Sequence, residues 1–173
     1  DTLYAQWGPQ HWWPGDTPFE IIVGAILTQN TNWTNVEKAI ANLKSARVLD
    51  PPALHSMAPD QLAELIRPAG YFRIKAKRLQ SFLTWLFDTA SGDLTQLTTR
   101  HTDSLREELL AIHGIGPETA DSILLYAFGR PVFVVDTYTA RIAVRHGLIE
   151  SPFGYDDLQD LFQSNLPDDG QLY

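Results

Sequence analysis

Hydrophobic residues recur every three or four positions along most of the chain, which is the spacing of an amphipathic helix with one buried face. Between Asn32 and Lys44, for example, one stripe holds Trp33, Val36, Ile40 and Leu43. The pattern predicts helices over residues 18–28, 32–44, 59–66, 71–88, 102–112, 137–146 and 155–165, and a further helix that begins at Pro117 and includes Ala127. In the helix over 71–88, the residues expected on or near the inner face are Ile74, Leu79, Phe82, Leu83 and Leu86.

One helix start and one extended segment complete the predicted fold. Thr17, Pro18 and Glu20 have the residue order of a capping box with proline in the first turn. The run from Val132 to Val135 is apolar and rich in β-branched residues, but no second run of this kind offers a partner strand. We interpret it as a buried extended link into the next helix. The sequence therefore predicts an all-α protein in which residues 1–173 form one unit.

The composition excludes several classes of protein. Of the 173 residues, 44% are hydrophobic, which is ordinary for a globular protein. The chain contains no cysteine, so it cannot supply the thiolates of a disulfide or an iron–sulfur cluster. No apolar run approaches the roughly 20 residues of a membrane span, and we identify no signal peptide at the start. These features fit a cytoplasmic protein that does not bind a membrane.

The charge of the chain is unevenly distributed. A formal net charge of −8 is unfavourable for a simple DNA-binding surface. However, residues 150–173 contain six acidic residues and no lysine or arginine, so residues 1–149 carry only −2. Within six positions the chain places four basic residues, Arg73, Lys75, Lys77 and Arg78. We predict a local basic surface there, with Arg73, Lys75 and Lys77 contacting DNA.

Two glycines lie between the helix over 102–112 and the helix that begins at Pro117. Gly114 and Gly116 permit backbone shapes and close approaches that a Cβ atom would block. The free N–H groups of the next helix lie beside them and can hold a phosphate oxygen, directly or through Na⁺ or K⁺ in the 112–117 turn. His113 flanks the turn and can also approach a phosphate. An ordinary tight turn is the alternative. No other metal is expected, because the five histidines have no metal-ligand spacing.

Asp136 directly follows the apolar run and precedes the helix that starts at Thr137. A structural role as the helix N-cap is the simple interpretation, because Asp is favoured there. The same place suits catalysis, since a helix N-terminus favours the ionised carboxylate and partial burial strengthens its field. A fixed anion of this kind can stabilise the oxocarbenium-like transition state that forms when a glycosidic bond breaks.

Aromatic residues gather near the start of the chain. Trp12 and Trp13 lie in a loop bounded by glycine and proline, where aromatic residues more often line a site than fill a core. An unstacked base gains about 1–3 kcal/mol from each stacking contact, and a cationic purine gains more from an indole face. Core packing is the alternative for each tryptophan. Gln29 and Asn30, at the end of an apolar helix, are candidates to contact DNA or to fill the place of a flipped base; an ordinary polar helix C-terminus is the alternative.

Two segments in combination resemble the helix-hairpin-helix DNA glycosylases of the endonuclease III superfamily. They are Gly114-Ile115-Gly116 and, about twenty residues later, Val135-Asp136-Thr137. Residues 27–31 are similar to that family's L-[ST]-x-[QN]-[TA] segment, and residues 70–79 to its G-[YF]-x-x-K-A-x-x-L segment. The resemblance extends from about His11 to about Leu166. It implies a two-lobed all-α fold with the active site in the cleft between the lobes, a hairpin over about 105–128, and Asp136 as the catalytic carboxylate.

One position departs from the pattern of the bifunctional members, which have a lysine in G-x-G-x-K-[TS]-A. Here that position is Glu118, followed by Thr119 and Ala120. A carboxylate cannot form the Schiff base that lyase chemistry needs. The resemblance therefore implies a monofunctional glycosylase that uses water as the nucleophile, with Thr119 among the residues that contact DNA.

Five segments are similar to one subgroup of the family, the 3-methyladenine DNA glycosylases III. They are residues 12–14, 28–31, 120–127, 134–138 and 155–159. The likeness implies a base pocket formed by Trp12, Trp13, Pro14, Trp33 and Glu118, in which Trp12 and Trp33 stack on the two faces of a flipped base. The subgroup's late, lysine-bearing H-G-K segment would fall after Tyr173, so we expect the 173 residues to be part of a longer chain.

The leading hypothesis is a monomeric, cofactor-free glycosylase of base excision repair that removes alkylated purines from double-stranded DNA. The alternatives are a glycosylase for mismatched or oxidised bases, and a helix-hairpin-helix module that binds DNA without catalysis. Asp136 behind an apolar run, with an aromatic loop in the chain, favours the two enzymes, because binding alone requires neither feature. The hairpin glycines disfavour a plain helical interaction domain.

Overall fold

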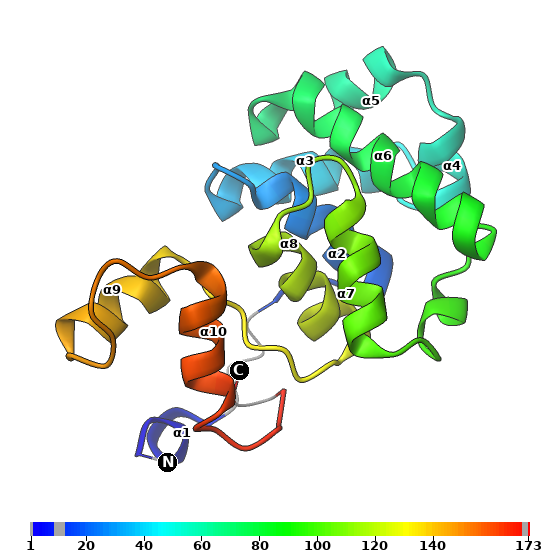
Figure 1. Cartoon of the computed structure of the whole chain (residues 1–173). Helices are drawn as coiled ribbons and strands as arrows, with labels where there is room; N and C mark the ends of the chain where they lie inside the picture. The colour runs from blue at the N-terminus through cyan, green and yellow to red at the C-terminus, as the bar shows by residue number, and fades with distance from the viewer. Residues whose placement is uncertain (1, 9–12, 171–172) are drawn as a thin grey trace.

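The chain folds into helices and connecting segments, with no strand, over the residues that the computed structural model describes, 2–8, 13–170 and 173. Figure 1 shows their arrangement. The α-helices are α1 Thr2–Trp7, α2 Pro18–Thr28, α3 Trp33–Ser45, α4 Pro51–Ser56, α5 Pro59–Leu65, α6 Phe72–Ala90, α7 Thr102–Ala111, α8 Pro117–Ser122, α9 Thr137–Arg145 and α10 Tyr155–Gln163. Two short 3₁₀ helices are η1 Arg67–Ala69 and η2 Leu94–Leu97, and α8 continues into a π-helical segment, η3 Ile123–Ala127. The predicted all-α class is confirmed.

The helix starts follow the capping signals in the sequence. Thr17 Oγ1 accepts a hydrogen bond from the backbone N–H of Glu20 at 3.1 Å, and Pro18 occupies the first turn of α2. The second half of the expected capping box differs, because the Glu20 carboxylate accepts from the backbone N–H of Asp16 and pairs with Lys44 at 2.7 Å. Asn32 caps α3 in the same way as Thr17 caps α2, by accepting from the N–H of Asn35.

Two of the observed α-helices were not among those predicted, and one residue was assigned to the wrong face. α1 and α4 are additional. At the start of α4, Asp50 accepts from the N–H of Ala53 at 2.8 Å and Pro51 follows directly, which is the same order of cap and proline as at α2. The expectation that Ile74 faces inward is wrong, since its side chain is 52% exposed.

The main hydrophobic cluster is built around α2, which packs against α3, α6, α8 and η3. Four residues of α2 have no exposed surface: Ile22, Val23, Ile26 and Leu27. Burial of each such side chain contributes about 1.5–3 kcal/mol, so α2 is firmly fixed. A second, smaller cluster joins the connecting segment to α9 and α10 through Val135, Ala143 and Leu158. Figure 1 shows α9 and α10 to one side of α2–α8.

Lys75 is a charged residue inside the main cluster. Its side chain is 1% exposed, and its ammonium donates to the backbone oxygens of Leu27 at 2.8 Å and Ala69 at 2.7 Å. Burial, and secondarily the nearby charge of Arg78, lower the pKa of Lys75 to about 8. The prediction that Lys75 contacts DNA is therefore wrong, because its ammonium is held between two elements of the fold, the C-terminal turn of α2 and η1.

Residues 131–136 form the link between η3 and α9, and none of them is in a helix or a strand. Val132 and Val135 are buried, as expected for a segment that passes through the protein rather than over its surface. The interpretation of this run as a buried extended link is confirmed. Its end delivers Asp136 to the first turn of α9.

Candidate active site

The hairpin between α7 and α8 uses its two glycines differently. Gly114 has φ +89°, a conformation that side chains with a Cβ rarely adopt, and a Cβ there would lie 2.8 Å from Cδ of Arg78 and closer still to its Cγ. Gly116 has an extended backbone and precedes α8, and a Cβ there would meet no protein atom within 4 Å. The fold therefore requires a glycine at 114, whereas the protein's own atoms leave space for a side chain at 116.

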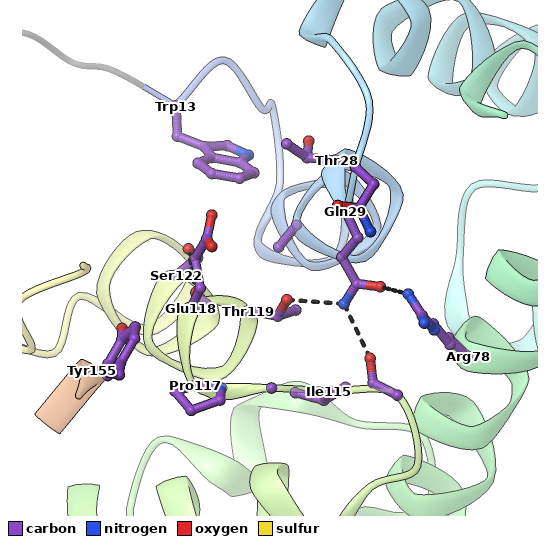
Figure 2. A pocket seen from close by; sticks show the side chains of 14 residues that line it. Trp13, Thr28, Gln29, Arg78, Ile115, Pro117, Glu118, Thr119, Ser122 and Tyr155 are labelled. Carbon is purple, nitrogen blue, oxygen red and sulfur yellow. Dashed lines mark hydrogen bonds between the residues drawn. The ribbon is translucent and has the colours of Figure 1, made fainter. Parts of the chain in front are cut away.

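A hydrogen-bonded network joins the hairpin to α2 and α6. Gln29 donates through Nε2 to the backbone oxygen of Gly114 at 3.0 Å and to Oγ1 of Thr119 at 2.9 Å. Its Oε1 accepts from a guanidinium nitrogen of Arg78. Figure 2 shows this network at the edge of a cavity. The amide of Gln29 thus bonds within the protein, and its expected contact with DNA stays a prediction, as does that of Thr119.

Beside this network lies a cavity of about 700 Å³. The loop before α2, α2 and the residues after it, the hairpin, α8, α6 and α10 all contribute to its lining. The described lining residues are Trp13, Ala25, Thr28, Gln29, Asn30, Arg78, Gly114, Ile115, Gly116, Pro117, Glu118, Thr119, Ser122 and Tyr155. Seven of these were predicted neither as pocket residues nor as DNA contacts: Ala25, Thr28, Arg78, Ile115, Pro117, Ser122 and Tyr155. Their places depend on contacts between distant segments, for which the sequence pattern holds no signal.

Trp13 forms an aromatic wall of this cavity. Its ring stacks on Tyr126, with centroids 5.0 Å apart, and meets Trp33 edge-on at 5.4 Å. Gly24, in the middle of α2, permits this packing, since a Cβ there would lie 3.4 Å from Trp13 Nε1 and 3.3 Å from Cη2 of Trp33. Because residue 24 has no side chain, the two indoles can pack close against α2.

Trp33 itself lines a second, smaller cavity of about 470 Å³ together with Trp13, Pro14 and Glu37. Its indole N–H donates to Glu37 Oε1 at 3.0 Å. The expected stacking of a base between Trp12 and Trp33 cannot be compared directly with this arrangement, because Trp12 lies outside the described residues. The structure brings Trp33 against Trp13 and away from the hairpin side of the larger cavity.

Two polar atoms at the larger cavity lack hydrogen-bond partners. Within the described part of the chain, the buried side-chain atoms without a partner are Trp13 Nε1, Thr28 Oγ1 and Arg130 Nε. Trp13 and Thr28 both line the cavity. Buried polar groups are nearly always paired, so these two atoms are exceptions; both are buried, and Trp13 Nε1 lies against α2 at Gly24.

Asp136 combines the two roles that the sequence left open. Its Oδ1 accepts from the backbone N–H of Thr139 at 2.7 Å and from Thr139 Oγ1 at 2.8 Å, so it is the N-cap of α9. Its Oδ2 accepts no hydrogen bond from any residue that the structure describes. One oxygen therefore fixes the carboxylate and the other is available for chemistry.

The charge of Asp136 acts on groups at the cavity. The pKa of Glu118, which lines the cavity, is raised by desolvation and, second, by the negative charge of Asp136. The pKa of Tyr126, which stacks on Trp13, is raised by burial and then by the same charge. Asp136 is not among the residues that line the cavity, but its field reaches Glu118, which does line it, and Tyr126, which stacks on the lining residue Trp13.

The remaining predicted residues lie on the surface. Arg73 and Lys77 are exposed on α6, His113 is exposed in the hairpin, and Asn30 is exposed after α2. Their contacts with DNA, and a monovalent cation at the hairpin, stay predictions. Across the described ranges, no group of three His, Cys, Asp or Glu side chains is placed to hold a metal ion. No helix among the described residues is both long and apolar enough to cross a membrane.

Comparisons with known proteins give a consistent result. Residues 23–168 match the family described as HhH-GPD superfamily base excision DNA repair protein. The chain is 47% identical over 173 residues to a protein named "Putative DNA repair glycosylase MJ1434" of Methanocaldococcus jannaschii, covering 99% of this chain and 78% of that protein. It is 32% identical over 152 residues to endonuclease III of Thermotoga maritima, covering 88% of this chain and 67% of that protein.

A solved structure of a DNA glycosylase has a similar fold. The chain is similar to the crystal structure of H. pylori 3-methyladenine DNA glycosylase (MagIII) bound to 1,N6-ethenoadenine, with a TM-score of 0.80 and 33% identity. The likeness covers 94% of this chain and 76% of that chain.

Proposed function

The chain belongs to the HhH-GPD superfamily of base excision DNA repair proteins, and we propose that it is a monofunctional glycosylase for alkylated purines of the 3-methyladenine type. Family membership makes it a DNA glycosylase of base excision repair and DNA its partner. The proposal concerns the two finer points, the absence of lyase chemistry and the class of the damaged base.

The main observation behind the proposal is that Asp136 has one carboxylate oxygen without a hydrogen bond among the described residues, close to a cavity whose described lining contains no lysine. Its Oδ1 is held by Thr139 and its Oδ2 is left without a hydrogen bond among the described residues. As the glycosidic bond breaks, positive charge develops on the sugar, and a fixed carboxylate oxygen stabilises it without first having to reorient. The base leaves with the electrons of the glycosidic bond, water forms a new bond to the sugar carbon, and the proton that this water loses passes to the Asp136 carboxylate or to the solvent.

The residues at the cavity support the proposed absence of lyase chemistry. Glu118 stands where the bifunctional members have lysine, and no lysine is among the described residues that line the cavity. A Schiff base requires a neutral amine within reach of the sugar. Lys75, whose pKa is lowered to about 8, is buried, bonded to two backbone oxygens and absent from the lining of the cavity.

Two features of the cavity favour a cationic purine. The indole of Trp13 offers an electron-rich face. Glu118 lines the same cavity, and the negative charge of Asp136 acts on Glu118. The similar H. pylori enzyme was solved with 1,N6-ethenoadenine, a modified adenine. A methylated purine has a weakened glycosidic bond, so a pocket of this kind can excise it without a strong general acid.

The test is to identify the released base. Duplex DNA treated with a methylating agent is incubated with the protein and the free bases are separated by chromatography. We expect 3-methyladenine or a related alkylated purine among the products. Duplexes with a mismatched base, 8-oxoguanine or an oxidised pyrimidine serve as parallel substrates, and preferential excision from one of these would favour the alternative glycosylase function instead.

A further inference from the structure

One face of α10 is directed at the link that carries Asp136. Tyr155, Gln159 and Gln163 are spaced by four residues, so they lie on one stripe of the helix. The hydroxyl of Tyr155 accepts from the backbone N–H of Val135 at 3.3 Å. Gln159 Nε2 donates to the backbone oxygen of Phe133 at 2.6 Å, and Gln163 Oε1 accepts from the N–H of Phe133 at 2.8 Å.

These bonds replace a strand partner. Buried backbone N–H and C=O groups must be paired, and an extended segment in an all-α fold has no neighbouring strand to pair with. Side chains of α10 satisfy three backbone groups of residues 133–135, directly before Asp136. The path of the link is therefore determined by α10.

The same stripe is anchored to the hairpin by a buried carboxylate. Asp121, on α8, has no exposed surface. Its Oδ2 accepts from the hydroxyl of Tyr155 and from Gln159 Nε2, each at 2.8 Å. Arg106, on α7, donates to both oxygens, at 2.7 and 3.0 Å. Burial and the charge of Asp121 raise the pKa of Tyr155 far above its usual value, so its hydroxyl stays protonated and donates to that carboxylate.

We propose that Asp121, Tyr155 and Gln163 are positioning residues that set the place of the Asp136 carboxylate relative to the hairpin. Tyr155 bonds at once to a carboxylate of α8 and to the residue directly before Asp136. The inference rests on the proposed role of Asp136 and adds residues to which no role in the reaction is otherwise given.

The effect on catalysis follows from the geometry of Asp136. Because Thr139 holds Oδ1, the carboxylate cannot turn independently and moves with the link and the start of α9. A displacement of about 1 Å at a reacting group can cost on the order of 100-fold in rate. Loosening the link should therefore lower the rate of the chemical step, whereas the hairpin, which is held by Gln29, should keep its affinity for DNA.

The experiment uses Tyr155→Phe and Gln163→Ala. Tyr155→Phe removes only the hydroxyl, and Asp121 keeps Arg106 and Gln159 as partners. Gln163 does not line the cavity among the described residues, so a loss there cannot come from contact with the base. Single-turnover excision from a methylated duplex should slow by about tenfold or more in Tyr155→Phe and by about threefold or more in Gln163→Ala. The dissociation constant for undamaged duplex should change by less than about twofold.

A second readout does not depend on activity. Amide hydrogen exchange at Val135 should be faster in Tyr155→Phe, and that at Phe133 faster in Gln163→Ala, than in the unmodified protein. The matched control is Tyr138→Phe, an equal loss of a hydroxyl from an exposed tyrosine two residues after Asp136, which should leave excision and exchange unchanged.

The outcomes separate the inference from the function on which it rests. Excision within twofold of the unmodified protein in both variants would overturn the positioning role, as would an equal loss of excision and DNA affinity. If the unmodified protein releases no alkylated purine, the proposed function fails, and if Asp136→Asn excises normally, the proposed role of Asp136 fails. In either case the exchange measurement still decides whether Tyr155 orders the link. If Tyr155→Phe does not fold, Gln163→Ala decides the question alone.

Discussion

The two glycines of the hairpin provide a matched pair of substitutions with opposite expected effects. Gly114→Ala places a Cβ on a backbone with φ +89° and into Cγ and Cδ of Arg78. Gly116→Ala places the same methyl group on an extended backbone with no protein atom within 4 Å. The first should therefore destabilise the protein, and the second should act on what approaches from outside.

The magnitude for Gly114→Ala has two parts. An alanine in a left-handed conformation costs about 1–2 kcal/mol. Displacing the stem of Arg78 also breaks its bond to Gln29, and a hydrogen bond with one charged partner contributes about 1.5–3 kcal/mol. The free energy of unfolding should fall by about 2.5–5 kcal/mol. For Gly116→Ala it should change by less than about 0.5 kcal/mol.

Two measurements check this pair. Unfolding in urea gives the stability, and titration of fluorescent duplexes, with and without an alkylated base, gives the affinity. Gly116→Ala should weaken binding to both duplexes by a similar factor, since contact with phosphates positions DNA without distinguishing bases. Stability losses of the same size in the two variants would refute the assignment of different roles, and so would unchanged affinity in a folded Gly116→Ala.

The other predictions concern the pocket, the lyase reaction and the buried lysine. Trp13→Ala and Trp33→Ala should each lower excision of alkylated purine but spare affinity for undamaged duplex, and Trp33→Phe should retain most activity because a flat face remains. Thr28→Val, which keeps the shape and removes a buried hydroxyl without a partner, should not lower stability. Borohydride should trap no covalent adduct on damaged DNA, since Glu118 forms no Schiff base. The pKa of Lys75 is lowered to about 8 in the folded protein, so above that pH the unfolded chain binds more protons than the folded one. The free energy of unfolding, measured relative to Lys75→Met, should therefore rise between about pH 8 and 10.5, by at most about 1.4 kcal/mol per pH unit.

The chain pattern predicted the helical fold and the place of Asp136 because both depend on local signals. Caps, proline at helix starts and hydrophobic spacing are encoded within a few residues of each other. Lys75 shows where a local interpretation went wrong. The run of basic residues suggested a surface, although Lys75 lies four residues before Leu79 and seven before Phe82, on the buried stripe of α6. The helical spacing of Lys75 relative to Leu79 and Phe82 indicates that its side chain lies on the buried face of α6.

The contacts that organise the site could not be predicted in this way. Arg78 meets Gln29 across 49 positions of the chain, and Tyr155 meets Asp121 across 34. Such pairs depend on how helices pack, and in the sequence the carboxylate of Asp121 is one acidic residue among 21. Asp136 differs because its two neighbours in the sequence, the apolar run and the helix start, are also its surroundings in space.

Asp136→Asn tests the central claim most directly. Asparagine keeps the size of the side chain and an oxygen that can accept from the N–H of Thr139, so the cap of α9 and the fold should be preserved. Only the negative charge is lost. The measurement is the single-turnover rate of base release from methylated duplex, together with the affinity for undamaged duplex and the unfolding curve. We predict that excision falls below a tenth of the original rate, a loss of more than about 1.4 kcal/mol of transition-state stabilisation, while affinity and stability stay nearly unchanged. A folded Asp136→Asn protein that releases the base at more than a tenth of the original rate would contradict the assignment of Asp136 as the catalytic carboxylate.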